Sequence, residues 1–209
     1  MCSEPTIHKI KSKKHKELCT YTTSLDSQKL TYPINCLTWT QAQKFCQWIG
    51  GKLPSEEEWE FVAKGGDEDQ IYPWGNEVSV QCSHAITALG KNPKAGLKSN
   101  LRGCGQNRLF PVCTLPKGTT KEGICDLSGS LWEFTRDCYT SQLQKNKPKS
   151  CTHYTIRGGG FWSNALQVPA SRRSKHKFNV ADMDVGFRCI THTKKIQKLD
   201  STSTRKNKK

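Results

Sequence analysis

The sequence predicts one compact, loop-rich domain in which short helices come first and short strands follow. Its 209 residues suffice for one sizeable hydrophobic core and are few for two. Only 34% of the residues are hydrophobic, but six Trp and seven Phe concentrate burial into a few large side chains. Turn signals also interrupt the chain repeatedly after its first third. We therefore expect little regular secondary structure and long, packed loops.

Two helices are indicated in the first third of the chain. Thr38 and Gln41 form a capping box, in which each side chain satisfies a free amide at a helix start, and Gly50 ends the apolar periodicity that follows. Ser55 and Glu58 form a second capping box. Three glutamates in the first turn of this second helix suit the helix dipole. We interpret them as a helix start and not as a metal or acid–base cluster.

The remainder of the chain is dominated by turns, at "GKNPKAG", "RGCGQN" and "LPKGTTKEG", with strand-like pieces at "YTIRGG" and "VGFRCI". The glycine run "RGGGFW", residues 157–162, could in principle cradle a phosphate group. No Lys-Ser/Thr pair and no helix start follows it, so the phosphate-loop interpretation is excluded. Close packing of backbone on backbone remains its expected role.

Most of the net charge of +15 lies at the two ends of the chain. Residues 1–18 contribute +3 and residues 192–209 contribute +6. Basic ends of this kind can bind nucleic acid by releasing counterions. No nucleic-acid motif accompanies them, so we expect a solvated, disordered tail and no nucleic-acid partner. No apolar run is long enough to span a membrane.

Cysteine usage indicates an oxidising compartment. Eleven cysteines are present and none forms a C-x-x-C pair, which gives little support to a structural zinc site. Several lie at intermediate spacings typical of disulfides that close short loops. These are Cys82 and Cys104, Cys113 and Cys125, and Cys138 and Cys151. In contrast, the opening residues show no apolar core of a signal peptide, which taken literally indicates a cytoplasmic chain.

Five blocks of sequence occur in the order found in the formylglycine-generating enzyme (sulfatase-modifying factor) family. They are "YPINCLTWTQAQKFCQWIGGKLPSEEEWEFVAKGG", "YPWGNE", "GICDLSGSLWEF", "IRGGGFW" and "DVGFRC". The resemblance implies an α+β, C-type-lectin-like fold over residues 33–191, followed by the basic tail 192–209. It also implies a shortened member, because residues 1–32 form a lysine-rich segment where the family has its first strand and helix. Family and cysteine content together imply a periplasmic or extracellular location.

The resemblance bears directly on catalysis. The family enzyme converts a substrate cysteine to formylglycine with oxygen and a copper ion held by two cysteines five residues apart. The matching positions here are Ser163 and Val168, which cannot hold Cu(I), an ion that prefers thiolates. Copper is therefore not expected, and we favour a non-catalytic, lectin-like domain that binds a ligand or protein partner through its loops. The alternatives are a formylglycine-generating oxidoreductase that uses other residues, and an inactive truncated fragment.

Two structural features of the family also have counterparts in this sequence. Cys46 and Cys189 match a disulfide that ties the first family helix to the last strand; the alternative is two separately buried thiols.

A family calcium site is matched by Asp126, Gly129, Leu131 and Glu133. Carboxylate and carbonyl oxygens from one tight loop are what this hard cation prefers. The alternative is that Glu133 only accepts hydrogen bonds within the turn.

Overall fold

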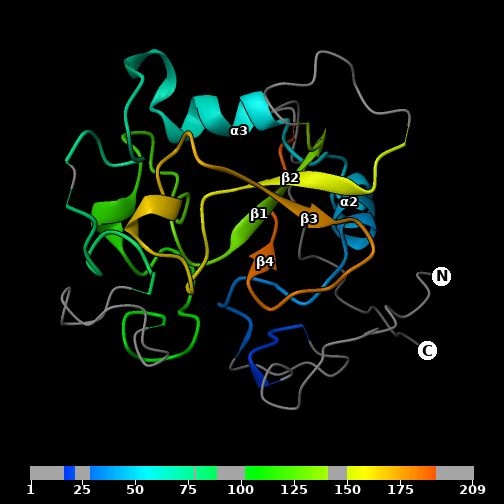
Figure 1. Cartoon of the computed structure of the whole chain (residues 1–209), viewed down its shortest axis with the longest axis horizontal. Coiled ribbons are helices and arrows are strands. Elements are labelled where there is room, and N and C mark those ends of the chain that lie inside the picture. The colour runs from blue at the N-terminus through cyan, green and yellow to red at the C-terminus, as the bar shows by residue number, and fades with distance from the viewer. Residues whose placement is uncertain (1–16, 22–28, 78, 89–101, 141–149, 192–209) are drawn as a thin grey trace, which may run out of the picture.

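The computed structural model describes residues 17–21, 29–77, 79–88, 102–140 and 150–191 (Figure 1). Two α-helices come first, α2 (Trp39–Trp48) and α3 (Glu56–Ala63). Four strands follow later in the chain: β1 (Trp132–Cys138), β2 (His153–Arg157), β3 (Arg173–Lys177) and β4 (Val185–Gly186). Three short 3₁₀ helices interrupt the loops, η2 (Gly66–Glu68), η3 (Pro116–Gly118) and η4 (Ala165–Gln167). The expected α+β fold with long loops is confirmed.

The strands form one small mixed sheet with the order β3-β2-β1-β4. β2 pairs antiparallel with both β1 and β3, whereas β4 pairs parallel with β1. The two helices pack on opposite faces of this sheet. On one face, Trp39 of α2 stacks on Tyr154 with ring centroids 3.6 Å apart. On the other, the indole of Trp59 in α3 donates a hydrogen bond to Glu133 at 2.7 Å.

Both predicted capping boxes are present and begin the two helices where expected. Thr38 caps α2 together with Gln41, and Ser55 caps α3 together with Glu58. Burial alone would raise the pKa of Glu58, but the Ser55 amide, Arg136 and Lys52 lower it to about 2. Glu58 thus caps the helix and pairs with Arg136 and Lys52, in agreement with the helix start that the sequence indicated.

Two strands were not anticipated from the sequence, β1 and β3. β3 reads "RSKHK", which lacks the apolar alternation of a half-buried strand because it lies at the edge of the sheet. β1 reads "WEFTRDC" and is buried over its first four residues, so it shows no simple alternation either. Of the segment "VGFRCI", only Val185 and Gly186 form a strand.

Five disulfides join all ten cysteines of the described residues. They are Cys19–Cys36, Cys46–Cys189, Cys82–Cys104, Cys113–Cys125 and Cys138–Cys151. The structure thus contains the pair implied by the family resemblance and the three pairs indicated by spacing. The last of them, Cys138–Cys151, joins β1 to the start of β2 and is called the β1–β2 disulfide below. Disulfides of this number are typical of oxidising compartments.

The Cys19–Cys36 disulfide, which was not predicted from the sequence, attaches residues 17–21 to the domain. Asn35, which is fully buried, strengthens this attachment. Its side-chain amide donates to the carbonyl oxygens of Leu18 at 3.0 Å and Met183 at 2.6 Å, and its oxygen accepts from the Thr20 amide at 2.7 Å. Part of the lysine-rich N-terminal segment therefore packs on the same core as the rest of the chain. Within the described residues, no helix is both long and apolar enough to cross a membrane.

Candidate functional site

The glycine turn that follows β2 carries the two positions at which the family resemblance implies copper ligands. Gly158 and Gly159 adopt positive φ angles of 91° and 74°, which residues other than glycine rarely adopt. Ser163 closes the turn and is only 2% exposed. Its hydroxyl oxygen accepts a hydrogen bond from the Gly160 amide at 2.9 Å, and its carbonyl oxygen accepts from the Ala88 amide at 2.8 Å. The Ser163 side chain therefore serves the turn itself.

Val168, the second position, is fully buried behind this turn. Its side chain packs so closely on Gly159 that a β-carbon there would lie 2.7 Å from a Val168 methyl group. Its carbonyl oxygen accepts from the Ser128 hydroxyl at 2.8 Å. A hydrocarbon side chain offers no metal ligand, and a buried serine hydroxyl is a poor one for Cu(I). These two residues do not fit a copper ion.

A buried carboxyl group lies directly against the glycine turn. A β-carbon at Gly160 would overlap the carboxyl group of Asp184. The Oδ1 atom of Asp184 is buried and has no hydrogen-bond partner among the described residues. Burial, and then the neighbouring Asp182, raise the pKa of Asp184 well above its usual range, although amides of Trp162 and Phe161 oppose this. The turn is thus packed on a carboxyl group for which the protonated form is favoured.

The four residues matching a calcium site lie close together, but their carboxylates are already engaged. Both oxygens of Glu133 accept hydrogen bonds from Arg188, at 2.6 and 2.7 Å, and Trp59 donates to the same carboxylate. The Asp126 carboxylate accepts from the Cys113 amide at 2.7 Å, and burial raises the pKa of Asp126.

The other two residues have structural roles. The Gly129 amide donates to Gly158 at 2.9 Å, and Leu131 is buried in the core. The positive charge that calcium would supply comes from the Arg188 guanidinium. As arranged, the Glu133 carboxylate is bound on both oxygens by Arg188 and does not fit the role of a calcium ligand.

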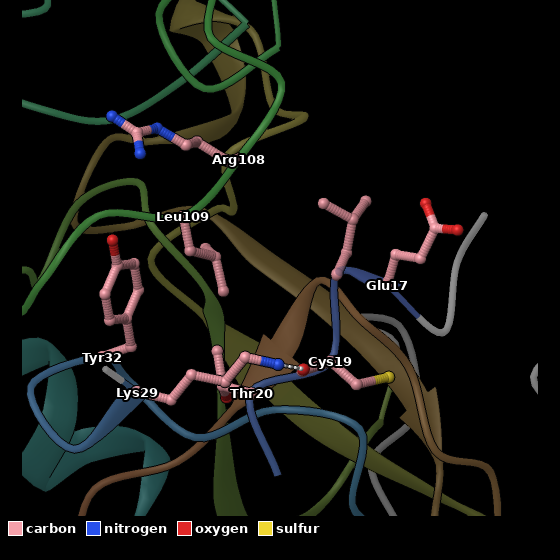
Figure 2. Close-up of a pocket in the computed structure, with 8 residues that line it drawn as sticks. Glu17, Cys19, Thr20, Lys29, Tyr32, Arg108 and Leu109 are labelled. Carbon is pink, nitrogen blue, oxygen red and sulfur yellow. Dashed lines mark hydrogen bonds between the residues drawn. The ribbon is translucent and has the colours of Figure 1, made fainter. Parts of the chain in front are cut away.

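A pocket of about 220 Å³ opens between the N-terminal segment and the loop that carries Arg108 and Leu109 (Figure 2). It is lined by Glu17, Leu18, Cys19, Thr20, Lys29, Tyr32, Arg108 and Leu109. Leu109 is buried and belongs to the same core cluster as Phe161 of the turn. Leu18 and Trp162, the residue that precedes Ser163, both pack against the cluster of Cys19, Cys36 and Met183. The apolar wall of the pocket therefore belongs to the same core clusters as Phe161 and Trp162 of the glycine turn.

Among the described residues, the charged groups around this pocket have no ionic partners. Lys29 donates to the carbonyl oxygen of Cys19 at 3.2 Å, and Arg108 donates to the Gln106 side chain. Within the described part of the chain, no carboxylate lies within 4.0 Å of either cation, and Glu17 forms no ion pair. Figure 2 shows Arg108 and Tyr32 on one side of the pocket and Glu17 on the other. Unpaired charges beside an apolar wall can bind a ligand of complementary charge.

The pocket could not be predicted from the sequence for a physical reason. Its lining comes from residues 17–20, 29–32 and 108–109, which meet only because the Cys19–Cys36 disulfide and the Asn35 hydrogen bonds bring the first segment onto the core. None of these residues stands in a motif. The only available signal was the presence of Cys19 and Cys36, and their pairing was not inferred.

The short mixed sheet, its two flanking helices and the disulfide-tied loops define an α+β domain of the C-type-lectin-like, formylglycine-generating-enzyme type. Comparison with known proteins gives the family. Residues 7–193 match the family model described as "Sulfatase-modifying factor enzyme 1-like domain". The chain belongs to this family.

Relatives of known sequence include both inactive and active members. The chain is 31% identical over 170 residues to "Inactive C-alpha-formylglycine-generating enzyme 2" of Bos taurus, covering 78% of this chain and 52% of that protein. It is 28% identical over 168 residues to "Formylglycine-generating enzyme" of Mus musculus, covering 76% of this chain and 44% of that protein. The chain thus spans about half the length of these relatives.

Solved structures support the same fold. "Treponema denticola variable protein 1" superposes with a TM-score of 0.62 at 17% identity, covering 81% of this chain and 74% of its own. "Structure of PvdO from Pseudomonas aeruginosa" gives a TM-score of 0.59 at 19% identity, covering 76% of this chain and 61% of its own. At these identities the likeness concerns the fold alone.

Proposed function

We propose that the protein is a non-catalytic sulfatase-modifying-factor-like domain that binds a ligand or partner through its loops. The observation that carries this proposal is that Ser163 and Val168, at the positions of the family's copper ligands, offer no ligand suited to Cu(I). Both side chains are buried, the hydroxyl of the first closes its own turn, and the second has no ligand atom. Every cysteine of the described residues is in a disulfide, so none of these offers the thiolate that Cu(I) requires. Similarity to proteins named as inactive adds support.

The catalytic part of the proposal is tested with a substrate peptide. A peptide containing Cys-x-Pro-x-Arg is incubated with the full chain, copper(I) and oxygen, and its mass is followed for loss of the cysteine thiol. We expect no conversion under conditions in which mouse formylglycine-generating enzyme converts the same peptide. Turnover by this chain would overturn the proposal. A Ser163→Ala variant would then show whether the chemistry uses the family's position or another part of the molecule.

The pocket of Figure 2 is the proposed ligand site. Lys29 and Arg108 place two cations around it, and Tyr32 adds an aromatic ring whose hydroxyl has no hydrogen-bond partner among the described residues. Buried Leu109 forms an apolar wall. A single carboxylate attached to a small apolar body would satisfy the cations and cover that wall. Glu17 at the other side disfavours ligands with several negative charges.

This site is tested with 3-phenylpropionate and its uncharged amide as probes. The carboxylate should raise the melting temperature of the chain, since a ligand that binds only the folded state stabilises it. The amide should not. A Lys29→Met/Arg108→Met variant should lose the response, whereas Lys117→Met/Lys121→Met, which removes the same charge elsewhere, should keep it. An equal response to the amide, or no response to either probe, would contradict the assignment.

We also infer that the protein works in an exported or secretory compartment. Five disulfides in a chain of this size would not persist under the reducing conditions of the cytosol. Alkylation of thiols before lysis of the source cells, followed by mass mapping, should recover Cys46 linked to Cys189. Recovery of both as alkylated thiols would show a reducing location.

A further inference from the structure

The face of the sheet that carries α3 divides into a neutralised part and an uncovered part. Arg157 and Arg173 lie opposite one another on β2 and β3. Arg157 pairs with Glu56 at 3.0 Å and with Glu60, and Arg173 pairs with the same Glu56 through two hydrogen bonds, one of 2.9 Å. Where α3 covers the sheet, arginines are therefore matched by glutamates.

Farther along the same two strands, the positive charges are not matched. Lys175 and Lys177 follow Arg173 at alternate positions of β3 and so point to the same face, while His153 of β2 lies opposite Lys177. Both lysines are exposed. Among the residues that the structure describes, no carboxylate lies within 4.0 Å of either ammonium group. The acidic groups of α3 do not extend to this end of the face.

An aromatic ring completes this surface. Tyr139 lies just beyond β1, and its ring has the Arg173 guanidinium and the Lys175 ammonium each 5.4 Å from its centroid. The ring therefore holds the first lysine in place through a cation–π contact. We call the surface formed by Tyr139, His153, Lys175 and Lys177 the basic edge, because β3 is the edge strand of the sheet in the described residues.

The direction in which the pKa of His153 is shifted agrees with a cationic surface that no carboxylate of the described residues neutralises. Burial first, and then Lys175, Lys177 and His176, lower the pKa of His153. His176 points to the other face, where it lies 3.5 Å from Asp182. The net positive field at His153 therefore comes mainly from the two lysines of its own face.

We propose that the basic edge is a binding surface for a sulfated polysaccharide. The two lysines are two residues apart on an extended strand, which spaces them by about 7 Å and suits a linear polyanion better than a single small anion. Sulfate groups remain charged at every physiological pH, and both lysines are exposed, so a ligand need not be desolvated deeply. Five disulfides are typical of chains in exported, oxidising compartments, and the polyanions outside cells are mainly acidic polysaccharides. The basic edge is separate from the pocket and from the positions of Ser163 and Val168.

Heparin serves as the probe, measured by calorimetric titration of the full chain at two salt concentrations. Lys175→Gln/Lys177→Gln should weaken binding by about tenfold, because two clustered surface charges are lost. The matched control is Lys117→Gln/Lys121→Gln, which removes two other exposed lysines and should change the affinity by less than about twofold. Both variants should unfold at the temperature of the parent chain, since all four side chains are exposed.

Three outcomes would overturn the proposal. Equal weakening by the two variants would mean that heparin responds to overall charge and not to the basic edge. Unchanged binding in the Lys175/Lys177 variant would leave the lysines with the separate role of keeping an exposed edge strand from pairing with other chains. Single-stranded DNA of matched charge binding as tightly, with the same dependence on the two lysines, would show a nucleic-acid surface.

Discussion

Replacing Arg188 with methionine tests whether a guanidinium group stands in for calcium in this domain. Arg188 makes two hydrogen bonds to Glu133, at 2.6 and 2.7 Å, and a third to the carbonyl oxygen of Cys125 at 3.1 Å. Glu133 is only 7% exposed. Methionine keeps much of the apolar volume of the arginine stem but leaves the carboxylate buried with Trp59 as its remaining hydrogen-bond donor.

The expected loss is large because one charge of a buried pair is removed. Breaking such a pair typically costs about 3 to 5 kcal/mol, so the free energy of unfolding of Arg188→Met should fall by roughly that amount. Asp69→Asn, which breaks the exposed pair with Lys64, should cost at most about 1 kcal/mol. The Glu133→Gln/Arg188→Met double variant should lose less than Arg188→Met alone, because no uncompensated charge remains.

Guanidinium chloride unfolding of the oxidised protein, with and without calcium, provides the measurement. Arg188→Met leaves Asp126 and Glu133 without their cation, so calcium should restore stability to this variant, by about 2.7 kcal/mol at a hundred times its Kd. The parent chain should not respond. A loss below about 1 kcal/mol in Arg188→Met would refute the weight given to the pair. A calcium response in the parent chain as large as that of the variant would show that Glu133 is available to the metal despite Arg188.

Three further outcomes follow from other parts of the fold. Cys46→Ala/Cys189→Ala should lower the free energy of unfolding by about 4.7 kcal/mol, because three smaller disulfides shorten the 143-residue loop that this disulfide closes to roughly 100 residues. Loss of the β1–β2 disulfide, which closes a much shorter loop, should cost only about 3 kcal/mol. Equal losses would refute the dependence on loop length. Because burial raises the pKa of Asp184 in the folded state, the folded state binds more protons and stability falls as pH rises above about 3.8. Asp184→Asn should therefore stabilise the chain at pH 7 and not at pH 3, and an unchanged pH–stability curve would show that the carboxyl group is solvated. Gly160→Ala should destabilise the folded chain by about 2 kcal/mol, because the new methyl group would overlap Asp184. A second change, Asp184→Ala, should recover part of that loss. Thermal unfolding that shows no such coupling between the two positions would contradict the contact.

Much of the local structure could be predicted from the sequence because it depends on neighbours in the chain. The capping boxes of α2 and α3 join residues three apart, and their side chains and amides meet whenever those residues form a helix start. The three disulfides of intermediate spacing are similar, since short loops bring their ends together readily. The Cys46–Cys189 pair was implied by family resemblance and not by any local signal.

What depends on distant residues was decided only by the tertiary structure. Glu133 had the residue type of a calcium ligand, but the sequence did not indicate that Arg188, which lies 55 positions away, would engage both of its oxygens. The pocket depends on a disulfide between Cys19 and Cys36 that no local pattern identified. The basic edge depends on the register of β2 against β3, which sets which side chains share a face. In each case the sequence determined which chemical groups are available, whereas the packing of segments far apart in the chain determined which of them remain unpaired and can bind a ligand.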